Sequence, residues 1–334
     1  MKTTASKRYD LLALGEPLLR LSPPGVGQLR CATSLDVHVA GAQFNMASNL
    51  ARLGMRTALL TKLPDHALGD LVVDACRRNG LDVSLIQRVP HSKIGVTYNE
   101  FSASPRAPLA IFDRTGSAAS CISPGDFDWD ALLPQSACAY TDGIFTGLSP
   151  NSLEAAGAFL TAARKHGCLT CFDVNYREHL WTPQAARDAW RILLPMVDAL
   201  ATNRNVTEAV FGYGGTDENL MRRYADEFGC RVVTLTNREM HGIAHGAWQA
   251  KVLSNGEVFD GRRMEFDIVD RYGTGDAYFA GFLYGFLERG AGFGADFGAA
   301  MCALAHTIIG DVANVTPDDV LAIMGDRIDL RVKR

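Results

Sequence analysis

Hydrophobic residues along the chain follow two patterns: short continuous apolar runs, and longer segments in which apolar positions recur every three or four residues. The first is typical of strands buried on both faces, and the second of helices with one buried side. Strands are predicted at 57–63, 169–175, 199–203 and 231–236, and helices at 66–80, 152–167 and 182–197. Because the two alternate over short connections, the sequence predicts an α/β fold with a mostly parallel sheet covered by helices on both faces.

Two regions interrupt this alternation, because strand-like pieces follow one another there without a helix between them. Residues 93–114 contain two such pieces, and the segment around 34–41 has the same character. We expect a small β-sheet lid, built from segments of about 16–40 and 93–115, on a single domain spanning residues 1–330. In open α/β sheets ligands bind outside the carboxyl ends of the strands, so the lid is expected to cover that edge.

The composition is that of a globular protein and indicates neither a nucleic-acid nor a membrane partner. The 334 residues are 47% hydrophobic and 21% charged, with a formal net charge of -4 and no long block of Lys or Arg. No stretch approaches the roughly 20 apolar residues of a membrane helix. The apolar run near the N-terminus meets Gly15-Glu16-Pro17, which predicts a first strand and not a signal peptide, so we expect a cytoplasmic protein.

The eight cysteines include a single Cys-x-x-Cys pair, Cys168 and Cys171, in a segment that predicts a buried strand. Strand alternation points these two side chains to opposite faces of the sheet. No second pair is available to complete a zinc site. Buried, reduced thiols are therefore expected.

Residues 273–276, Gly-Thr-Gly-Asp, stand at the start of a long apolar segment that predicts a buried helix. Glycines let the backbone approach a ligand closely, and the unpaired N–H groups and the dipole at a helix start favour an anion. A carboxylate beside such an anion hole, Asp276, can take a proton from an attacking hydroxyl, which suits phosphoryl transfer. The alternative is that Asp276 is an ordinary first-turn acid and that the glycines serve helix packing.

Other nucleotide-binding patterns are missing from the sequence. The P-loop pattern G-x-x-x-x-G-K-[ST] does not occur, and the glycines at 212–215 neither follow a clear strand nor have G-x-G-x-x-G spacing. A nucleotide-dependent dehydrogenase is therefore a poorly supported alternative.

Three separated segments together resemble the ribokinase-like (PfkB-type) carbohydrate kinases. Residues 267–281, DIVDRYGTGDAYFAG, resemble the C-terminal signature of that family, and residues 38–54, HVAGAQFNMASNLARLG, look like its Gly-rich substrate segment. Residues 205–208 resemble its Asn-x-x-Glu motif. The resemblance implies a ribokinase-like three-layer α/β/α fold with a mostly parallel sheet and a small β-sheet lid, and ATP and Mg²⁺ as cofactors.

Within this family the chain looks most like the 2-keto-3-deoxygluconate kinases, through residues 12–25, 111–118, 172–186 and 303–316. The resemblance extends over nearly the whole chain. It implies that a phosphoryl group is transferred to the primary C6 hydroxyl of a sugar acid. It also implies that Asp276 is the catalytic base and that Gly273, Thr274 and Gly275 form the anion hole.

The resemblance also assigns expected binding roles to two larger groups of residues. The sugar is expected to contact Gly41, Ala42, Asn45, Thr97, Phe112, Arg114, Asn175, Arg177 and Asp276. The nucleotide is expected to contact Asn203, Asn205, Glu208, Thr236, Arg238, Gly273, Gly275 and His306, with Asn205 and Glu208 helping to place magnesium with the ATP phosphates. The implied partners are a sugar or sugar acid and ATP, and the lid edge offers a surface through which a homodimer can form.

Two arginines of these groups bear on the charge of the substrate. An arginine fork matches a carboxylate through two parallel hydrogen bonds, so Arg177 and Arg114 suit a sugar acid. The alternatives are ion pairs within the protein, with Asp173 or Glu178 for Arg177 and with Asp113 for Arg114.

The sequence also departs from the family pattern at the expected sugar site. Residues 40–43, Ala-Gly-Ala-Gln, stand where Gly-Gly-Ala-Glu is usual, and Phe112 and Thr97 stand where tyrosines are expected. A site that loses such hydroxyl groups can change its substrate preference. The sugar therefore stays open: the alternatives are a kinase of fructose, ribose or another keto-deoxy acid, and a non-catalytic sugar-binding protein.

Overall fold

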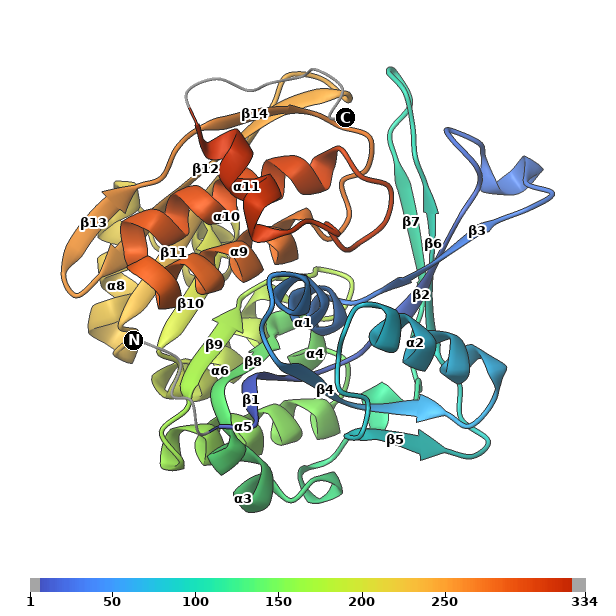
Figure 1. The fold of residues 1–334 in the computed structure, drawn as a ribbon, viewed down its shortest axis with the longest axis horizontal. Helices are drawn as coiled ribbons and strands as arrows, with labels where there is room; N and C mark the ends of the chain where they lie inside the picture. The colour runs from blue at the N-terminus through green and yellow to red at the C-terminus, as the bar shows by residue number, and fades with distance from the viewer. Residues whose placement is uncertain (1–6, 326–334) are drawn as a thin grey trace.

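A ten-stranded sheet forms the centre of the computed structural model, which describes residues 7–325 (Figure 1). Its strands are β1 (Tyr9–Leu14), β4 (Thr57–Pro64), β5 (Ile86–Val89), β8 (Ser136–Asp142), β9 (Leu169–Asp173), β10 (Ala199–Asn203), β11 (Val232–Met240), β12 (His245–Ser254), β13 (Glu257–Asp260) and β14 (Met264–Asp267). The order is β13-β12-β11-β10-β9-β8-β1-β4-β5, and β14 also pairs with β12. Every neighbouring pair from β11 to β5 is parallel, which confirms the predicted sheet.

The antiparallel end of the sheet, from β12 to β14, was not predicted from the apolar pattern. Strand β12 runs antiparallel to β11, and β13 returns along β12 from the turn at Asn255 and Gly256. Both turn residues have positive φ, 51° and 82°, as the tightest hairpin turns require. The Asn-Gly dipeptide was therefore an available hairpin signal.

Helices cover both faces of the sheet, and the residues of β1 show how the two layers are separated. Leu11 and Ala13 belong to a core cluster shared with α1 (Ala42–Arg52), α2 (Ala67–Arg78), α9 (Thr274–Arg289) and α10 (Ala291–His306). Leu12 and Leu14 belong to a second cluster shared with α5 (Pro150–Lys165), α6 (Pro183–Leu193) and α8 (Asp217–Phe228). Since alternate residues face opposite layers, the fold is the expected three-layer α/β/α arrangement.

The remaining helices are short or lie at the margins of these layers. They are α3 (Trp129–Leu132), α4 (Gly143–Thr146), α7 (Arg204–Val206) and α11 (Pro317–Met324). No helix within residues 7–325 is both long and apolar enough to cross a membrane.

The Cys168–Cys171 segment confirms the predicted alternation. Both side chains are buried and free, and Cys168 packs in the cluster with α5 whereas Cys171 packs in the cluster with α9.

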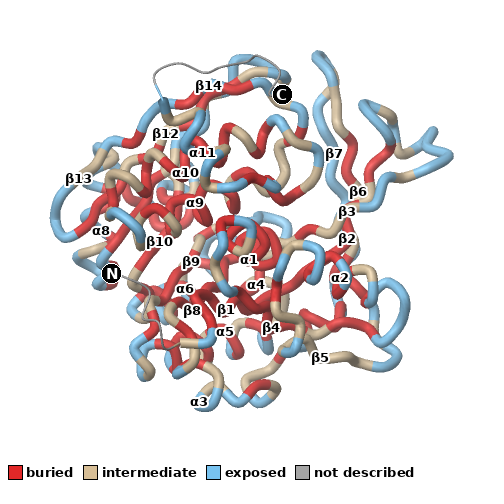
Figure 2. The backbone as a smooth tube through the Cα atoms, viewed as in Figure 1, coloured by how far each residue is buried: buried red, intermediate tan, exposed pale blue. Residues whose placement is uncertain are grey.

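A separate four-stranded sheet projects from the body as the lid (Figure 1, right). Its order is β3 (Asp36–Ala40), β2 (Leu18–Ser22), β6 (Gly95–Glu100) and β7 (Leu109–Asp113). Figure 2 shows that buried residues follow the main sheet, while much of the projecting lid is exposed. The outer strand β7 is exposed along its whole length.

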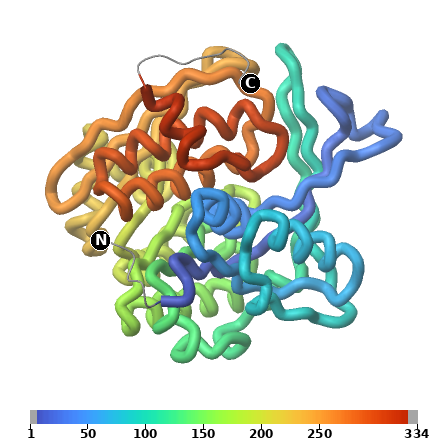
Figure 3. The backbone as a smooth tube through the Cα atoms, in the orientation of Figure 1, coloured from blue at the N-terminus to red at the C-terminus, as the bar shows by residue number. Residues whose placement is uncertain are grey.

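Helices α9 and α10 pack closely side by side. A Cβ atom at Gly285 would lie 2.8 Å from the Cα atom of Gly294, so the two backbones approach as only glycines allow. Helix α9 also packs on α1. In Figure 3 the blue N-terminal segments accordingly adjoin the orange and red C-terminal ones.

Candidate active site

A cavity of about 160 Å³ lies between the lid and the carboxyl ends of the central strands. Every residue predicted to bind the sugar lines it: Gly41, Ala42, Asn45, Thr97, Phe112, Arg114, Asn175, Arg177 and Asp276. Gly273 of the predicted anion hole lines it as well. Residues of the lid strands, of the loops that follow β1 and β9, and of the N-terminal turn of α9 thus converge on one cavity.

The turn before α9, where an anion hole is predicted, contains two glycines in different surroundings. Gly273 has a φ of 69°, and a Cβ atom there would lie 2.0 Å from the backbone oxygen of Asp311. A Cβ at Gly275, by contrast, would meet nothing within 4 Å. The Thr274 hydroxyl donates to the Arg271 carbonyl at 3.1 Å and accepts from Arg238 Nη2 at 2.8 Å. The open space therefore lies against the first N–H groups of α9, which have no partners within the helix.

Asp276 is buried in the first turn of α9, where its Oδ2 accepts a hydrogen bond from Asn45 Nδ2 at 2.8 Å. Burial raises the pKa of the Asp276 carboxyl well above its usual value, and the charges of Asp173 and Asp142 add to the effect. The Asn45 hydrogen bond and the Arg177 charge oppose it. Asn45 Oδ1 is buried with no partner among the described residues, so it is available to a ligand.

Two further carboxylates stand on neighbouring strands at the same edge of the sheet. Asp142 ends β8, Asp173 ends β9, and the two are partners in the strand register. Burial raises the pKa of Asp142 to about 6, against hydrogen bonds from the Phe145 N–H and from Gln43. Burial and the Asp142 charge raise the pKa of Asp173 to about 7. Gln43, which stands where the family pattern has a glutamate, is neutral, so it adds no further negative charge next to Asp142.

Arg177 lines the cavity and is held there by a hydrogen bond to Asn175. The Asn175 backbone N–H donates to Asp173 Oδ1 at 3.0 Å, and its side-chain Nδ2 donates to Asp142 Oδ2 at 3.4 Å. Asn175 Oδ1 accepts from Arg177 Nη2 at 2.9 Å. Among the described residues Arg177 forms no ion pair with Asp173 or Glu178 within 4 Å, so much of its guanidinium remains available.

Arg114 is committed to a partner inside the protein. Its Nε lies 2.7 Å from Glu16 Oε2, its Nη2 bonds the same oxygen, and the Ser117 hydroxyl bonds Glu16 Oε1. Asp113, the partner considered from the sequence, pairs instead with Lys93 at 2.7 Å. The prediction that Arg114 forms an ion pair within the protein is thus confirmed, but its partner is Glu16 and not Asp113. The sequence did not reveal this partner because Glu16 lies in a distant part of the chain.

The lid meets the body across the cavity mouth through an aromatic stack. The rings of Phe112 on β7 and His179 lie 4.2 Å apart at an interplanar angle of 10°, and both line the cavity. Burial lowers the pKa of His179, and the positive charges of Arg114 and Arg177 lower it further. Thr97, the other expected tyrosine position, donates its hydroxyl to Asn99 at 2.7 Å.

Five of the eight predicted nucleotide residues lie in β11, at the end of β10 or just after it: Asn203, Asn205, Glu208, Thr236 and Arg238. Asn203 and Thr236 are register partners there, and Asn203 caps α7 by accepting from the Val206 N–H at 3.0 Å. Glu208 lies on the surface and pairs with Arg204 at 2.9 Å. Asn205 is also exposed. Arg238, farther along β11, connects this region to the anion hole through Thr274.

His306 differs from the expectation of a nucleotide contact, because its side chain is fully buried. Its Nδ1 donates to the Cys302 carbonyl at 2.8 Å, its Nε2 accepts from Arg238 Nη2 at 2.8 Å, and its ring stacks on Phe266 at 3.8 Å. Burial lowers the pKa of His306 to about 4. The neutral ring therefore orients Arg238, and no surface of it is left for a ligand.

Several residues that line the cavity were not predicted. They are Glu16, Leu18, Arg20, Asn99, Ile144, His179, Tyr272 and Asp311. Glu16, Arg20 and His179 lie in segments that carry the family resemblance, so their place in those segments was the available signal.

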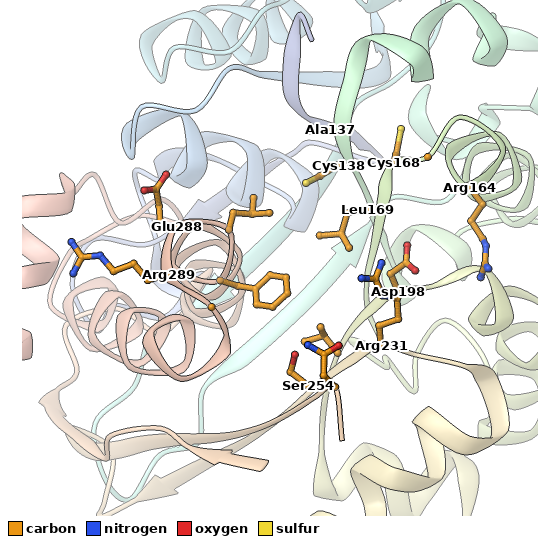
Figure 4. A pocket seen from close by; sticks show the side chains of 16 residues that line it. Ala137, Cys138, Arg164, Cys168, Leu169, Asp198, Arg231, Ser254, Glu288 and Arg289 are labelled. Atoms are coloured by element: carbon orange, nitrogen blue, oxygen red, sulfur yellow. The ribbon is translucent and has the colours of Figure 1, made fainter. Parts of the chain in front are cut away.

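A larger cavity, of about 680 Å³, lies at the opposite edge of the main sheet, where β8, β9 and β11 begin and α9 ends (Figure 4). Its lining includes Cys138, Asp198, Arg231 and Arg289. None of the predicted site residues borders it.

Comparison with known proteins identifies the family to which the chain belongs. A family model described as "pfkB family carbohydrate kinase" matches residues 19–308. The chain therefore belongs to the pfkB family of carbohydrate kinases, and its predicted ribokinase-like fold is confirmed. It is 35% identical to a 2-dehydro-3-deoxygalactonokinase of Haloferax volcanii, over 94% of this chain and 96% of the relative.

Two further relatives point in the same direction. A 2-dehydro-3-deoxygluconokinase of Thermoproteus tenax is 31% identical over 93% of this chain and 92% of the relative. The crystal structure of a 2-dehydro-3-deoxygluconokinase from Thermotoga maritima superposes with a TM-score of 0.90 at 30% identity, covering 94% of this chain and 97% of that one. The resemblance to keto-deoxy sugar-acid kinases inferred from the motifs is thus confirmed.

Proposed function

We propose that the protein is an ATP- and Mg²⁺-dependent kinase that phosphorylates the primary C6 hydroxyl of 2-keto-3-deoxygluconate. The observation that carries this proposal is the meeting of three features in one cavity: the N-terminal turn of α9 at Gly273, the buried carboxyl of Asp276, and the available guanidinium of Arg177. Together they suit a transferred phosphoryl group, a hydroxyl that loses its proton, and a substrate carboxylate.

In this mechanism Asp276 acts as the general base. Its ionised carboxylate takes the proton of the C6 hydroxyl while that oxygen forms a bond to the γ-phosphorus and the bond to the ADP oxygen breaks. The raised pKa makes the carboxylate a stronger base, and Asn45 stabilises and orients the ionised form. The N–H groups at Gly275 and its neighbours receive the charged phosphoryl oxygens.

The phosphate groups are assigned to this turn because a Cβ atom at Gly275 would meet nothing within 4 Å, which leaves space beside the turn. Asn203, Thr236 and Arg238 are proposed to hold the nucleotide along the ends of β10 and β11, and His306 supports Arg238. Asn205 and Glu208 are proposed to position Mg²⁺, which neutralises phosphate charge when bound. Glu208 is paired with Arg204 at the surface, where ion pairs are weak and easily exchanged.

The carboxylate of the sugar acid is assigned to Arg177 in preference to Arg114. The charge of Arg114 is already matched by Glu16, whereas Arg177 has only the neutral Asn175 oxygen as a hydrogen-bond partner among the described residues. We expect Arg177→Ala to raise the KM for a sugar acid far more than the KM for a neutral sugar. Equal effects on both would remove the carboxylate assignment.

The proposal is tested by measuring ADP release with Mg-ATP and 2-keto-3-deoxygluconate, its galactonate epimer, gluconate, fructose and ribose. The highest kcat/KM is expected for 2-keto-3-deoxygluconate. The best turnover on fructose or ribose would favour a kinase of a neutral sugar, and binding without turnover would favour a sugar-binding protein.

Asp276→Ala is expected to abolish turnover while largely preserving ATP binding, and near wild-type turnover would exclude Asp276 as the base.

We further propose that the protein acts in the cytoplasm and pairs as a homodimer through the lid. All eight cysteines are free, as is usual in a reducing compartment. The outer lid strand β7 leaves its edge unpaired within the described residues and exposes Leu109, Ile111 and Phe112. An exposed apolar edge of this kind suits strand pairing with a second copy.

A further inference from the structure

A buried arginine of the lid, Arg20 on β2, forms two ion pairs with residues from the other end of the chain. Its Nη2 lies 2.8 Å from Asp270 Oδ2, and its Nε lies 2.8 Å from Asp311 Oδ2. The side chain of Arg20 is 1% exposed. Neither the apolar pattern nor the motif roles predicted this cluster of Arg20, Asp270 and Asp311.

The two carboxylates belong to the two loops that build the anion hole. Asp270 Oδ1 accepts from the Tyr272 N–H at 3.0 Å, and Asp270 Oδ2 accepts from the Gly310 N–H at 3.0 Å. The backbone of Asp311 lies directly against Gly273. Arg20 therefore ties the loop before α9 and the loop after α10 to each other and to the lid.

Aromatic rings complete this connection between lid and body. The Arg20 guanidinium carbon lies 4.8 Å from the ring centre of Tyr272 and 5.5 Å from that of Phe101. Tyr272 immediately precedes the anion hole, whereas Phe101 directly follows lid strand β6. One ring thus comes from the lid and the other from the body; both lie against the guanidinium, and their centres are 5.6 Å apart.

One nitrogen of Arg20 has no role inside the protein. Nη1 is buried and lacks a hydrogen-bond partner among the described residues, while Arg20 and Asp311 both line the sugar cavity. A buried, unmatched donor destabilises a fold, and buried ion pairs give little net stability in return. The arrangement is therefore better explained by a ligand oxygen that completes it than by folding alone.

We propose that Arg20 is a positioning residue of the kinase site, which holds the anion-hole loops in their catalytic arrangement from the lid and leaves Nη1 for an oxygen of the bound substrates. The proposal rests on the kinase function proposed above. It makes the geometry of the anion hole depend on the lid, so the phosphate site is complete only when the lid is in place.

The test compares Arg20→Met, Arg20→Lys and Arg20→Ala with the wild type on whichever sugar the wild type phosphorylates best. Because a displacement of about 1 Å can cost roughly 10²-fold in rate, we expect Arg20→Met to lower kcat by about that factor. The KM for ATP should change little. Arg20→Lys keeps the charge but cannot make both side-on contacts, so its kcat should also fall clearly.

Chemical rescue separates positioning from folding. Free guanidinium, at concentrations too low to denature, should restore a large part of the kcat lost in Arg20→Ala, because the two carboxylates and the rings still form its binding site. The matched control is Arg56→Ala, which removes the ion pair of a half-exposed arginine with the buried Asp10 in β1 and should neither lower kcat nor respond to guanidinium. Thermal melts establish that each variant is folded.

The proposal is overturned if a folded Arg20 variant keeps wild-type kcat and sugar KM, or if guanidinium fails to restore folded Arg20→Ala. Should the Ala and Met variants not fold, the Lys variant decides by the same criterion. If the wild type phosphorylates no sugar, the proposed function fails and this inference fails with it. If the wild type is active and the variants match it, only the inference fails.

Discussion

Gly273 and Gly275 are two residues apart and meet different physical demands. Gly273 has a left-handed backbone and packs against Asp311, so a side chain there is both strained and blocked. Gly275 has neither restriction, and only open space lies where its Cβ would be. The first glycine is needed by the fold, and the second is needed, on our proposal, by the phosphate.

We therefore predict opposite consequences for two alanine substitutions. Gly275→Ala should melt near the wild-type temperature and lose most of its kcat, because the new methyl group occupies the phosphate space. Gly273→Ala should be destabilised by at least about 1–2 kcal/mol from the left-handed backbone alone. Thermal melts and steady-state kinetics measure both. An active Gly275→Ala enzyme would argue against the anion hole.

The carboxylate pair Asp142 and Asp173 predicts a dependence of stability on pH. Because burial raises their pKa values in the folded state to about 6 and about 7, the folded protein binds more protons than the unfolded chain above the unfolded value near 3.8. Stability should therefore fall as pH rises from the unfolded pKa through the folded pKa.

Asp173→Asn tests this sign, because it removes one of these charges while keeping the size of the side chain. We expect the variant to exceed the wild type in melting temperature by more at pH 8 than at pH 5. The surface variant Asp74→Asn, at a side chain 58% exposed, serves as the control and should show no such difference. A gain that is equal at both pH values would contradict the assigned pKa shift.

At the scale of elements, the sequence predicted the parts whose signals are local. Helices such as α5 and strands such as β4 follow from apolar period and turn residues, and α9 follows from its motif and its long apolar run. The hairpin of β12 and β13 was missed although Asn255 and Gly256 mark its turn.

The missed contacts are those between distant segments. Arg20 meets Asp311 across 291 positions, and Arg114 meets Glu16 across 98. Neither apolar period nor residue spacing encodes such pairs, since they arise only when the two sheets come together. The motifs therefore located the site, and the folded chain was needed to show which charges in it are already paired.

The lid strand β7 contacts the body through the stack of Phe112 on His179. Replacing Phe112 or His179 by alanine should raise the KM for the sugar, with little effect on the KM for ATP, because the two stacked rings line the cavity. Aromatic pairs contribute about 0.5–1.5 kcal/mol beyond their buried area. The loss of sugar-binding free energy in the double variant should be smaller than the sum of the losses in the two single variants. Full additivity would mean that the two rings contribute independently and not through their stack.

At the scale of the whole molecule, the lid carries large apolar side chains that remain exposed to solvent. Its outer strand exposes 49% of Ile111 and 44% of Leu109. If two lids pair, light scattering should give the mass of a dimer for the wild type and of a monomer for Ile111→Glu, with similar melting of the body. A wild-type monomer at micromolar concentration would exclude this assembly.

The junction of Arg20 with Asp311 also bears on how the protein is made. During synthesis the lid strand β2 leaves the ribosome long before residue 311 has been translated. Arg20 therefore cannot form its ion pair with Asp311 until late in synthesis. The phosphate-binding turn at Gly273 likewise lacks the backbone it packs against. On the proposed mechanism a chain that ends before Asp311 lacks the contacts that shape the phosphate site, so phosphoryl transfer to the sugar begins only after this residue has been added and packed.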